Sequence, residues 1–303
     1  MSNHTNRRDI LKLMGIGGVA FASGLAGAAT SAYGKTKTKK SDVSEDFFFL
    51  QLSDTHWGYS GVSNPEADVT LPTAIKTINA TTATPDFIVF TGDLTHNTDD
   101  AAVRVKRLAE FKERAAALRV KTLYFLPGEH DAAKDAGAAY KDAFGPTHYT
   151  FDHKGVHFVT LDNVSDPAGA VGASQIDWLA ADLKKTPPAT PVVVFTHRPL
   201  FDLYPQWEWS TQDGAKVVDV LLARKNVTVF YGHIHQEHHH QTEHIAHHAA
   251  RSLVFALPPA GSVPKKQPLA FDAAAPFKGL GYRQVDVPTL PGDLRLLERP
   301  VTT

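Results

Sequence analysis

Residues 47–56 read FFFLQLSDTH, and this stretch decides the fold. Its first six residues are apolar except for Gln51, which is typical of a strand buried within a sheet. Asp54 and His56 follow directly, and side chains two residues apart in extended backbone point to the same side. The stretch therefore predicts a buried strand that ends in a carboxylate and an imidazole facing one common point.

Four more stretches repeat this pattern of an apolar strand followed by acidic or histidine side chains. They read FIVFTGD (87–93), TLYFLPGEHD (122–131), VVVFTH (192–197) and VTVFYGHIH (227–235). Polar groups at the carboxyl ends of strands in an α/β sheet meet in one crevice, so we expect these side chains to converge. Glycines within three of the stretches let the backbone turn sharply beside that crevice.

The segments around these strands predict a mixed fold of helices and strands. Helical periodicity predicts helices at 71–80, 101–118, 174–184 and 215–223, and further strands are expected at 149–152, 156–161, 252–257 and 282–287. On the helix 101–118 we expect Val105 on the buried face with Leu108 and Phe111. This order of elements favours two packed sheets with helices outside over a single parallel sheet.

The composition excludes several kinds of site and partner. The 303 residues contain no cysteine, so disulfides, thiolate zinc sites and thiol nucleophiles are excluded. A formal net charge of −1 gives no reason to expect a nucleic-acid partner. The 16 histidines suit a zinc, iron or manganese site, because these metals take imidazole and carboxylate ligands.

The N-terminus predicts an export signal. Arg7 and Arg8 precede a weakly apolar run at 13–29, which resembles a twin-arginine signal peptide. An uncleaved membrane anchor is the alternative, although the glycines in the run lower its hydrophobicity. We expect residues 1–34 to be the signal and residues 35–46 a disordered linker. The protein would then use the twin-arginine export machinery, reach the periplasm or the exterior, and keep no stable membrane anchor.

The five stretches resemble, in order and spacing, the motifs of the calcineurin-like metallophosphoesterases: D-x-H, G-D, G-N-H-D, a lone H and G-H-x-H. The resemblance implies an αββα sandwich, in which two mixed β-sheets lie between layers of helices, and we assign residues 47–303 to this domain. It also implies hydrolysis of a small-molecule phosphate ester by water. Two divalent or trivalent metal ions, such as iron, manganese or zinc, would assist the reaction.

The same resemblance assigns a role to each motif residue. The metal ligands would be Asp54, His56 and His235 for the first ion, His197 and His233 for the second, and Asp93 as the bridge between them. His130 and Asp131 are the candidate catalytic residues. His130 would contact the phosphate or protonate the leaving oxygen, and Asp131 would orient His130 from behind.

Glu129 departs from the family pattern, which has asparagine at this position. If Glu129 is a ligand, it adds a third carboxylate and removes one unit of positive charge from the metal cluster. A dianionic monoester loses about twice as much attraction as a monoanionic diester, so phosphodiesters are somewhat favoured. A phosphomonoesterase or nucleotidase, and a metal-binding protein with catalysis weakened by Glu129, are the alternatives.

Other side chains near the motifs have two interpretations each. One histidine-rich segment would be either a metal-collecting loop or an exposed hairpin; its members are His238, His239, His240, His244, His247 and His248. Tyr204, Trp207 and Trp209 would either wall a substrate pocket or pin a loop. His96 and Arg198 adjoin ligand segments, and loop packing is an alternative to phosphate contact for Arg198.

Overall fold

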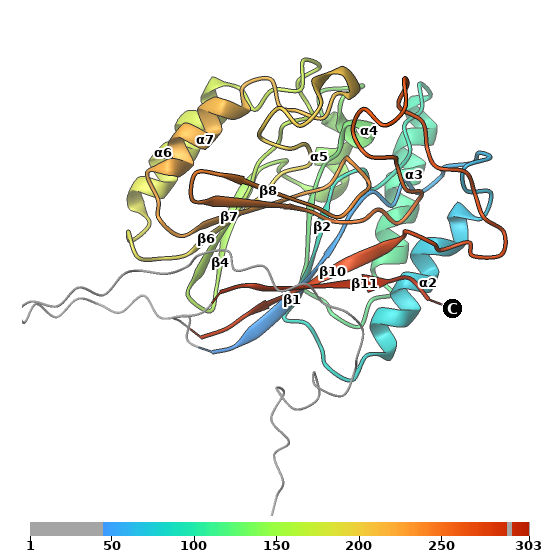
Figure 1. Ribbon diagram of the computed structural model, residues 1–303, viewed down its shortest axis with the longest axis horizontal. Coiled ribbons are helices and arrows are strands. Elements are labelled where there is room, and N and C mark those ends of the chain that lie inside the picture. Colours follow the sequence, from blue (N-terminus) through green and yellow to red (C-terminus); the bar gives the residue numbers. More distant parts are fainter. Residues whose placement is uncertain (1–44, 290–292, 303) are drawn as a thin grey trace, which may run out of the picture.

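The computed structural model describes residues 45–289 and 293–302, in which two β-sheets pack face to face between helices (Figure 1). The elements in chain order are β1 (Phe47–Leu52), α2 (Ala67–Ala80), β2 (Phe87–Thr91), α3 (Ala101–Ala115), β3 (Leu123–Leu126), α4 (Glu129–Ala132), α5 (Ala138–Phe144), β4 (Tyr149–His153), β5 (Val156–Thr160), α6 (Ala173–Lys185), β6 (Val192–Phe195), η1 (Pro205–Trp207), α7 (Gly214–Leu222), β7 (Val227–Tyr231), β8 (His238–Thr242), β9 (Ile245–Ala249), β10 (Gly281–Val287) and β11 (Arg295–Pro300).

The first sheet has the strand order β11-β10-β1-β2-β3. Strands β1, β2 and β3 run parallel, and β10 pairs with β1 in the antiparallel direction. Both faces of β1 are buried: Leu50 packs with Leu71 of α2 and Phe111 of α3, whereas Phe49 faces the second sheet. Burial on both faces explains why the sequence of this strand is apolar almost throughout.

The second sheet has the order β4-β5-β6-β7-β9-β8. Strands β5, β6, β7 and β9 run parallel, and β4 and β8 pair with their neighbours as antiparallel strands. Helices α6 and α7 cover its outer face (Figure 1), where Leu179 and Leu221 pack with Val194 and Val229. This sheet carries the ligand segments of the C-terminal half at the ends of β6 and β7.

Aromatic rings fill the space between the two sheets. Phe49 stacks on Phe87 with ring centroids 4.9 Å apart. It also meets Phe158, Phe195 and Phe230 of the second sheet edge to face at 5.8 to 5.9 Å, a geometry that aromatic quadrupoles favour. The layers are thus helices, sheet, sheet and helices, and the predicted αββα fold class is confirmed.

The structure corrects two predictions about secondary structure. Residues 252–257 form no strand, because the backbone of Leu253 hydrogen-bonds across to the carbonyls of Ser53 and Asp54 at 3.2 Å. On α3, Val105 is 58% exposed, and Arg104 takes the inner position and pairs with Asp135 at 3.2 Å. The sequence patterns also missed α4, α5 and β11, which are short or irregular in hydrophobic period.

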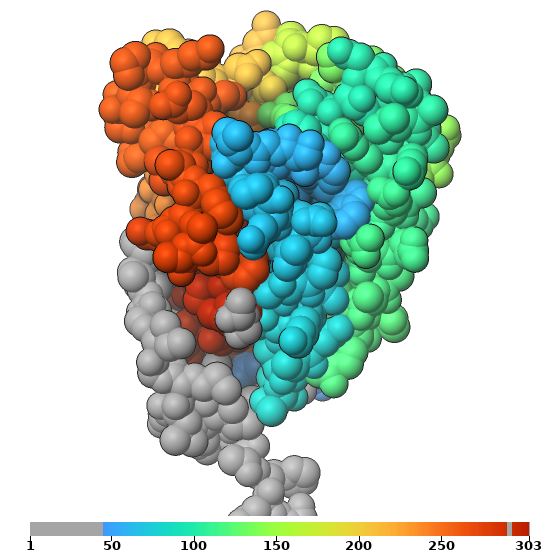
Figure 2. Space-filling view, turned by 90° about the vertical axis from the view of Figure 1, so that its right-hand side faces the viewer, coloured from blue at the N-terminus to red at the C-terminus, as the bar shows by residue number. Residues whose placement is uncertain are grey.

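The segment that follows β1 lies on the surface between two others. Figure 2 shows residues 55–65 in blue, bordered by the loop 251–280 in orange-red and by α3 in teal. Asn64 donates to the carbonyl of Val254 at 2.6 Å, which ties the loop 251–280 to this segment. The loop therefore forms one wall beside the end of β1.

The predicted signal at 1–34 lies outside the described residues, as does most of the predicted linker. Asp46, which was assigned to that linker, accepts hydrogen bonds from the backbone and hydroxyl of Thr289 at 2.6 and 2.7 Å. None of the helices in residues 45–289 and 293–302 has the length and apolar character needed to cross a membrane.

Candidate metal centre

Five of the seven predicted ligands lie in left-handed backbone conformations just after their strands. Their φ angles run from 42° to 65°, at Asp54, His56, Asp93, His233 and His235. Such a conformation costs about 1–3 kcal/mol for a residue other than glycine, and it persists where the surrounding structure imposes it. Left-handed residues concentrate at functional sites, and here they mark the ends of β1, β2 and β7.

Two glycines allow these turns to approach one another. A Cβ atom on Gly128 would collide with the backbone and carboxylate of Asp93. A Cβ atom on Gly92, whose φ is 93°, would collide with the ring of His197. Glycine is therefore required at both positions, and larger residues would push the ligand segments apart.

The side chains of the first group of candidate ligands lie close together. The Nε2 atom of His235 lies 3.2 Å from Asp54 Oδ1 and 3.3 Å from His56 Nε2. His56 Nε2 in turn lies 3.3 Å from Asp93 Oδ2. All four side chains are buried, and Asp54, His56 and His235 form a group that could hold a metal ion.

The second group forms around Glu129. Its Oε1 lies 2.8 Å from His233 Nδ1, and its Oε2 lies 2.9 Å from His197 Nε2. Glu129 therefore lies between the two histidines predicted to hold the second ion, and these three residues form another group that could hold a metal ion. Arg198 approaches from behind, with its Nε atom 3.6 Å from Glu129 Oε2.

Asp93 lies between the two groups. Its Oδ2 atom is 3.3 Å from His56 Nε2 and 3.5 Å from His197 Nε2, which belong to different groups. Its Oδ1 atom accepts a hydrogen bond from the backbone of His130 at 2.9 Å. This is the position that a bridging carboxylate needs.

The donor atoms of the second group fit a cation. Glu129 Oε2, His197 Nε2 and His233 Nδ1 are buried and make no hydrogen bond within the described part of the chain, despite their close approach. Buried polar atoms are rarely left without a partner, and lone pairs that converge in this way fit a metal ion. Burial opposes ionisation of the Glu129 carboxyl, but His233 and His197 hold its pKa well below the usual range. The carboxylate is therefore charged and suited to a metal.

In three ligand histidines, the ring nitrogen that points away from the metal centre (the outer nitrogen) faces a backbone carbonyl. His197 Nδ1 lies 2.7 Å from the oxygen of Thr91, His235 Nδ1 2.8 Å from that of Phe255, and His233 Nε2 3.0 Å from that of Glu208. A carbonyl only accepts, so each outer nitrogen carries the proton and the inner nitrogen keeps its lone pair for a metal. The fold thus sets the tautomer that metal binding requires.

Comparison with known proteins agrees with this geometry. The model of the family described as calcineurin-like phosphoesterase matches residues 49–237, more than half of the chain. The chain belongs to this family.

Curated relatives of this calcineurin-like chain are named as phosphodiesterases. A probable cyclic nucleotide phosphodiesterase from Rhodococcus erythropolis is 29% identical over 200 residues, which is 62% of this chain and 64% of the relative. A cAMP/cGMP dual specificity phosphodiesterase from Mycobacterium tuberculosis is 29% identical over 205 residues, or 63% of this chain and 62% of the relative. The chain thus spans just under two thirds of the length of these relatives.

Solved structures share the fold at low sequence identity. A purple acid phosphatase from yellow lupin seeds aligns with a TM-score of 0.63 at 12% identity, covering 85% of this chain and 52% of that chain. A dimetal phosphatase from Danio rerio aligns with a TM-score of 0.59 at 12% identity, covering 84% of this chain and 99% of that chain. The likeness supports the αββα fold of this calcineurin-like chain.

His130 lies at the open side of the centre. Its Nδ1 atom accepts a hydrogen bond from the backbone N–H of Asn97 at 3.2 Å, so in the neutral ring the proton is on Nε2. That Nε2 atom lies 4.0 Å from Asp93 Oδ2, and the side chain is 22% exposed. The nitrogen that carries the proton therefore lies beside the carboxylate predicted to bridge the two ions.

Asp131 does not orient His130, and this part of the prediction was wrong. Its two carboxylate oxygens accept from the backbones of Gly128, Leu94 and Thr95 and from the Thr95 hydroxyl, at 2.8 to 3.0 Å. Asp131 therefore ties the loop after β3 to the loop after β2, and so holds Glu129 and Asp93 in register. Burial and the Asp93 carboxylate raise the pKa of Asp131 to about 7.

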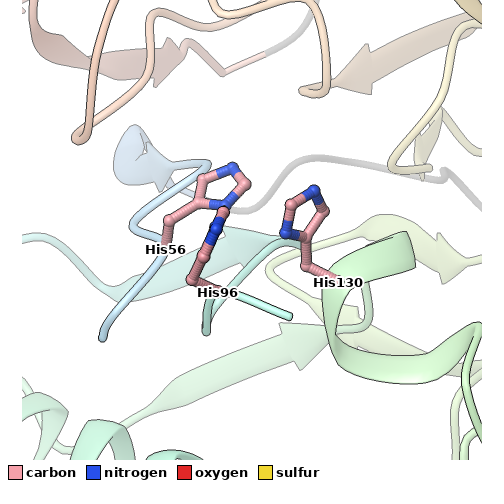
Figure 3. A group of neighbouring side chains, drawn as sticks. All are labelled: His56, His96 and His130. Atoms are coloured by element: carbon pink, nitrogen blue, oxygen red, sulfur yellow. The ribbon is translucent and has the colours of Figure 1, made fainter. Parts of the chain in front are cut away.

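Sequence reasoning placed His96 beside a ligand segment but assigned it no role. Its Nδ1 atom lies 3.2 Å from His56 Nδ1, and the imidazoles of His56, His96 and His130 lie together (Figure 3), with ligand atoms within 4.8 Å of one another. The sequence feature that could have indicated a role for His96 is its position three residues after Asp93, in the turn that follows β2. The aromatic residues Trp207 and Trp209, by contrast, are buried with Tyr231 and Ile234 and pin their loop to the second sheet.

Proposed function

We propose that this chain hydrolyses small-molecule phosphodiesters with the help of two metal ions. The proposal rests on the position of Asp93 between the two ligand groups. Its Oδ2 atom lies 3.3 Å from His56 Nε2 of the first group and 3.5 Å from His197 Nε2 of the second. Asp93 would help to hold both ions, and the bound metal would supply Lewis acidity that lowers the pKa of a water molecule to about 7. Iron, manganese and zinc all suit the imidazole and carboxylate donors.

The residues of the chain supply the remaining steps. Water attacks phosphorus, the bond from phosphorus to the ester oxygen breaks, and the leaving oxygen takes a proton. His130 Nε2–H donates a hydrogen bond to that oxygen as charge develops on it, because the Asn97 backbone holds Nδ1 as an acceptor and leaves the ring proton on Nε2. The proton that the attacking water loses balances the one that the leaving oxygen gains. Asp93 holds both ligand groups together, and Asp131 holds the loops that carry them.

Diesters are favoured over monoesters for two reasons. Glu129 places a third carboxylate among the ligands, and the lost positive charge penalises a dianion about twice as much as a monoanion. The positive charge of Arg198, 3.6 Å from Glu129, offsets part of this penalty, so the preference is moderate. The relatives also support diesters, since the two described above are named for cyclic nucleotides. One from Arcobacter nitrofigilis is named as a probable glycerophosphodiester phosphodiesterase, at 28% identity over 160 residues, or 50% of this chain and 56% of the relative.

The test is hydrolysis by the protein reloaded with manganese or zinc. The substrates are bis(p-nitrophenyl) phosphate, p-nitrophenyl phosphate, 3′,5′-cyclic AMP and a glycerophosphodiester. We expect diesters to be hydrolysed faster than the monoester. Hydrolysis should be lost in Asp93→Ala but kept in the control Asp99→Ala, which alters an exposed carboxylate nearby. Faster monoester turnover would favour a phosphomonoesterase or nucleotidase. Bound metal without turnover would favour a metal-binding protein with weakened catalysis.

We propose in addition that the protein is exported through the twin-arginine route. Support comes from Arg7 and Arg8 before the weakly apolar run at 13–29. Replacing both arginines with lysine should leave the precursor in the cytoplasm, as measured by fractionation of a host that has the export system. Undiminished export of that variant would exclude this route.

A further inference from the structure

His56 differs from the other ligand histidines in the group that faces its outer nitrogen. His197, His233 and His235 each face a backbone carbonyl, which no substitution of a side chain removes directly. His56 Nδ1 instead lies 3.2 Å from Nδ1 of another side chain, His96. Within the described residues, His56 is thus the one ligand histidine whose outer partner is a side chain.

The pairing sets the tautomer of both rings. His56 Nε2 faces Asp93 Oδ2 at 3.3 Å and His235 Nε2 at 3.3 Å, so this atom needs its lone pair to bind a metal. The proton of a neutral His56 must then lie on Nδ1, and it requires an acceptor because His56 is 2% exposed. His96 Nδ1 is that acceptor, so His96 carries its own proton on Nε2.

The surroundings hold His96 in place for this role. Its backbone N–H donates to the carbonyl of Trp57 at 2.9 Å, and its carbonyl accepts from Arg107 at 2.7 Å. Its ring meets the ring of Tyr59 edge to face, with centroids 5.0 Å apart. Figure 3 shows His96 directly beside His56, with His130 facing them from a separate segment. The acceptor is therefore built into the turn after β2.

We propose that His96 is a positioning residue for the first metal ion, acting through the hydrogen bond from His56 Nδ1–H to His96 Nδ1. This inference rests on the proposed dinuclear site. A partner of this kind orients the ligand ring and raises its basicity, and its loss costs about 10–100-fold in metal affinity. His96 thus sets how tightly the first ion is held, while backbone carbonyls fix the tautomers of the other ligand histidines.

The test compares His96→Leu with His96→Asn. The two side chains have nearly the same shape, but the Asn oxygen lies near the position of the histidine Nδ1 and accepts a hydrogen bond. Metal-free protein would be titrated with Zn²⁺ against a chromophoric chelator, in the Glu129→Ala background that weakens the second site. We expect His96→Leu to lower the affinity of the remaining ion about 10–100-fold and His96→Asn to restore most of it.

Equal affinity in the Leu variant and its parent would overturn the inference. So would three zinc ions per wild-type chain and two in His96→Leu, because His96 would then be a ligand itself. If the Leu variant does not fold, NMR of the zinc-loaded wild-type chain with ¹⁵N-labelled imidazoles replaces it. We expect a scalar coupling across the hydrogen bond between the Nδ1 atoms of His56 and His96. Absence of this coupling overturns the assignment. A wild-type chain that binds only one ion would contradict the proposed function directly and separately.

Discussion

The metal centre and the β8–β9 hairpin are both rich in histidine, yet their imidazoles face different partners. In the centre, the inner nitrogens of His56, His197, His233 and His235 lie 2.8 to 3.3 Å from oxygens of Asp54, Asp93 or Glu129. In the hairpin, most imidazoles instead contact aromatic rings or one another, although His239 Nε2 also lies 3.4 Å from Glu237 Oε1. His240 stacks on Phe201 at 3.8 Å, and His239 Nδ1 lies 2.7 Å from His248 Nδ1.

The hairpin was expected to be an exposed pair of strands or a metal-collecting loop. The hairpin itself is confirmed, but β9 is buried along its whole length. His247 is fully buried, and neither of its ring nitrogens has a hydrogen-bond partner among the described residues. Burial lowers the pKa of His247 to about 3 and that of His248 to about 2, so both rings are neutral at pH 7.

The difference shows what a metal site needs beyond histidine. The ligand segments end strands in left-handed turns that turn the side chains towards carboxylates from other strands. Five of the hairpin histidines lie inside regular strands, where the sheet directs them into its two faces, and His244 lies in the turn between β8 and β9. None of the hairpin histidines belongs to a group of three possible metal ligands in residues 45–289 and 293–302.

Asp93 gives the strongest test of this comparison, because it serves both ligand groups. Asp93→Ala should hold well under half of the wild-type metal and lose activity by several orders of magnitude. His240→Ala, which alters a hairpin imidazole, should keep its full metal content. Elemental analysis and turnover would be measured on both proteins. Full metal in Asp93→Ala, or metal loss in His240→Ala, would contradict the division between the two regions.

His130, like His96, is an imidazole of the centre that we do not count as a ligand, and it is the one proposed to act on the leaving oxygen. His130→Ala should keep its metal and lose about 10²–10⁴ in rate, the usual contribution of general acid catalysis. The loss should be smaller for nitrophenolate, a leaving group that needs no proton, than for an alkoxide. Rates on a matched pair of aryl and alkyl diesters would show this. An equal loss on both would mean that His130 binds the phosphate instead.

Glu129 tests the charge of the second ligand group. Glu129→Gln keeps the length of the side chain and removes its charge, so metal binding should weaken. The ratio of monoesterase to diesterase activity should rise by about tenfold or less, since Arg198 at 3.6 Å already offsets part of the charge. Both rates would be measured at saturating metal. An unchanged ratio with full metal, in Glu129→Asn as well, would show that Glu129 is not a ligand.

His247 tests the hairpin, where the expected effect is on stability. His247→Leu removes a buried polar group without partners, so metal-free protein should be unchanged or stabilised by about 1 kcal/mol at pH 7. The pKa of His247 is about 3 in the fold, against about 6.5 when unfolded. Above pH 6.5 the ring is neutral in both states, and the free energy of unfolding keeps its full value. As the pH falls from 6.5 towards 3, only the unfolded chain binds a proton at His247, so the free energy of unfolding decreases.

Urea unfolding of the two metal-free proteins between pH 4 and pH 6 would measure this effect. Wild type should lose about 1.4 kcal/mol more per pH unit than His247→Leu, because its unfolded chain takes up one more proton. Identical slopes would show that His247 already has a partner or reaches solvent. A large loss of metal affinity in His247→Leu would instead return the hairpin to the metal-binding interpretation.

The sequence by itself predicted the strands that carry the site. Apolar runs ending in Asp54 and His56, or in His233 and His235, show both the buried strand and the i, i+2 spacing, because both features are local. These predicted strands agree with β1 and β7 to within one residue at each end. The departure at Glu129 was also visible without a structure, since it lies within a short motif.

Only the tertiary structure decided which atoms face one another across the chain. His96 and His56 are 40 residues apart, and Asp131 accepts from Leu94 at a separation of 37. A helical or strand period describes one segment and contains no information about such partners. For the same reason the strand predicted at 252–257 was wrong, since Leu253 hydrogen-bonds to the turn after β1. The burial of His247 against Phe201 could not be predicted either. Local spacing selects the ligands, and packing between distant segments decides what orients them.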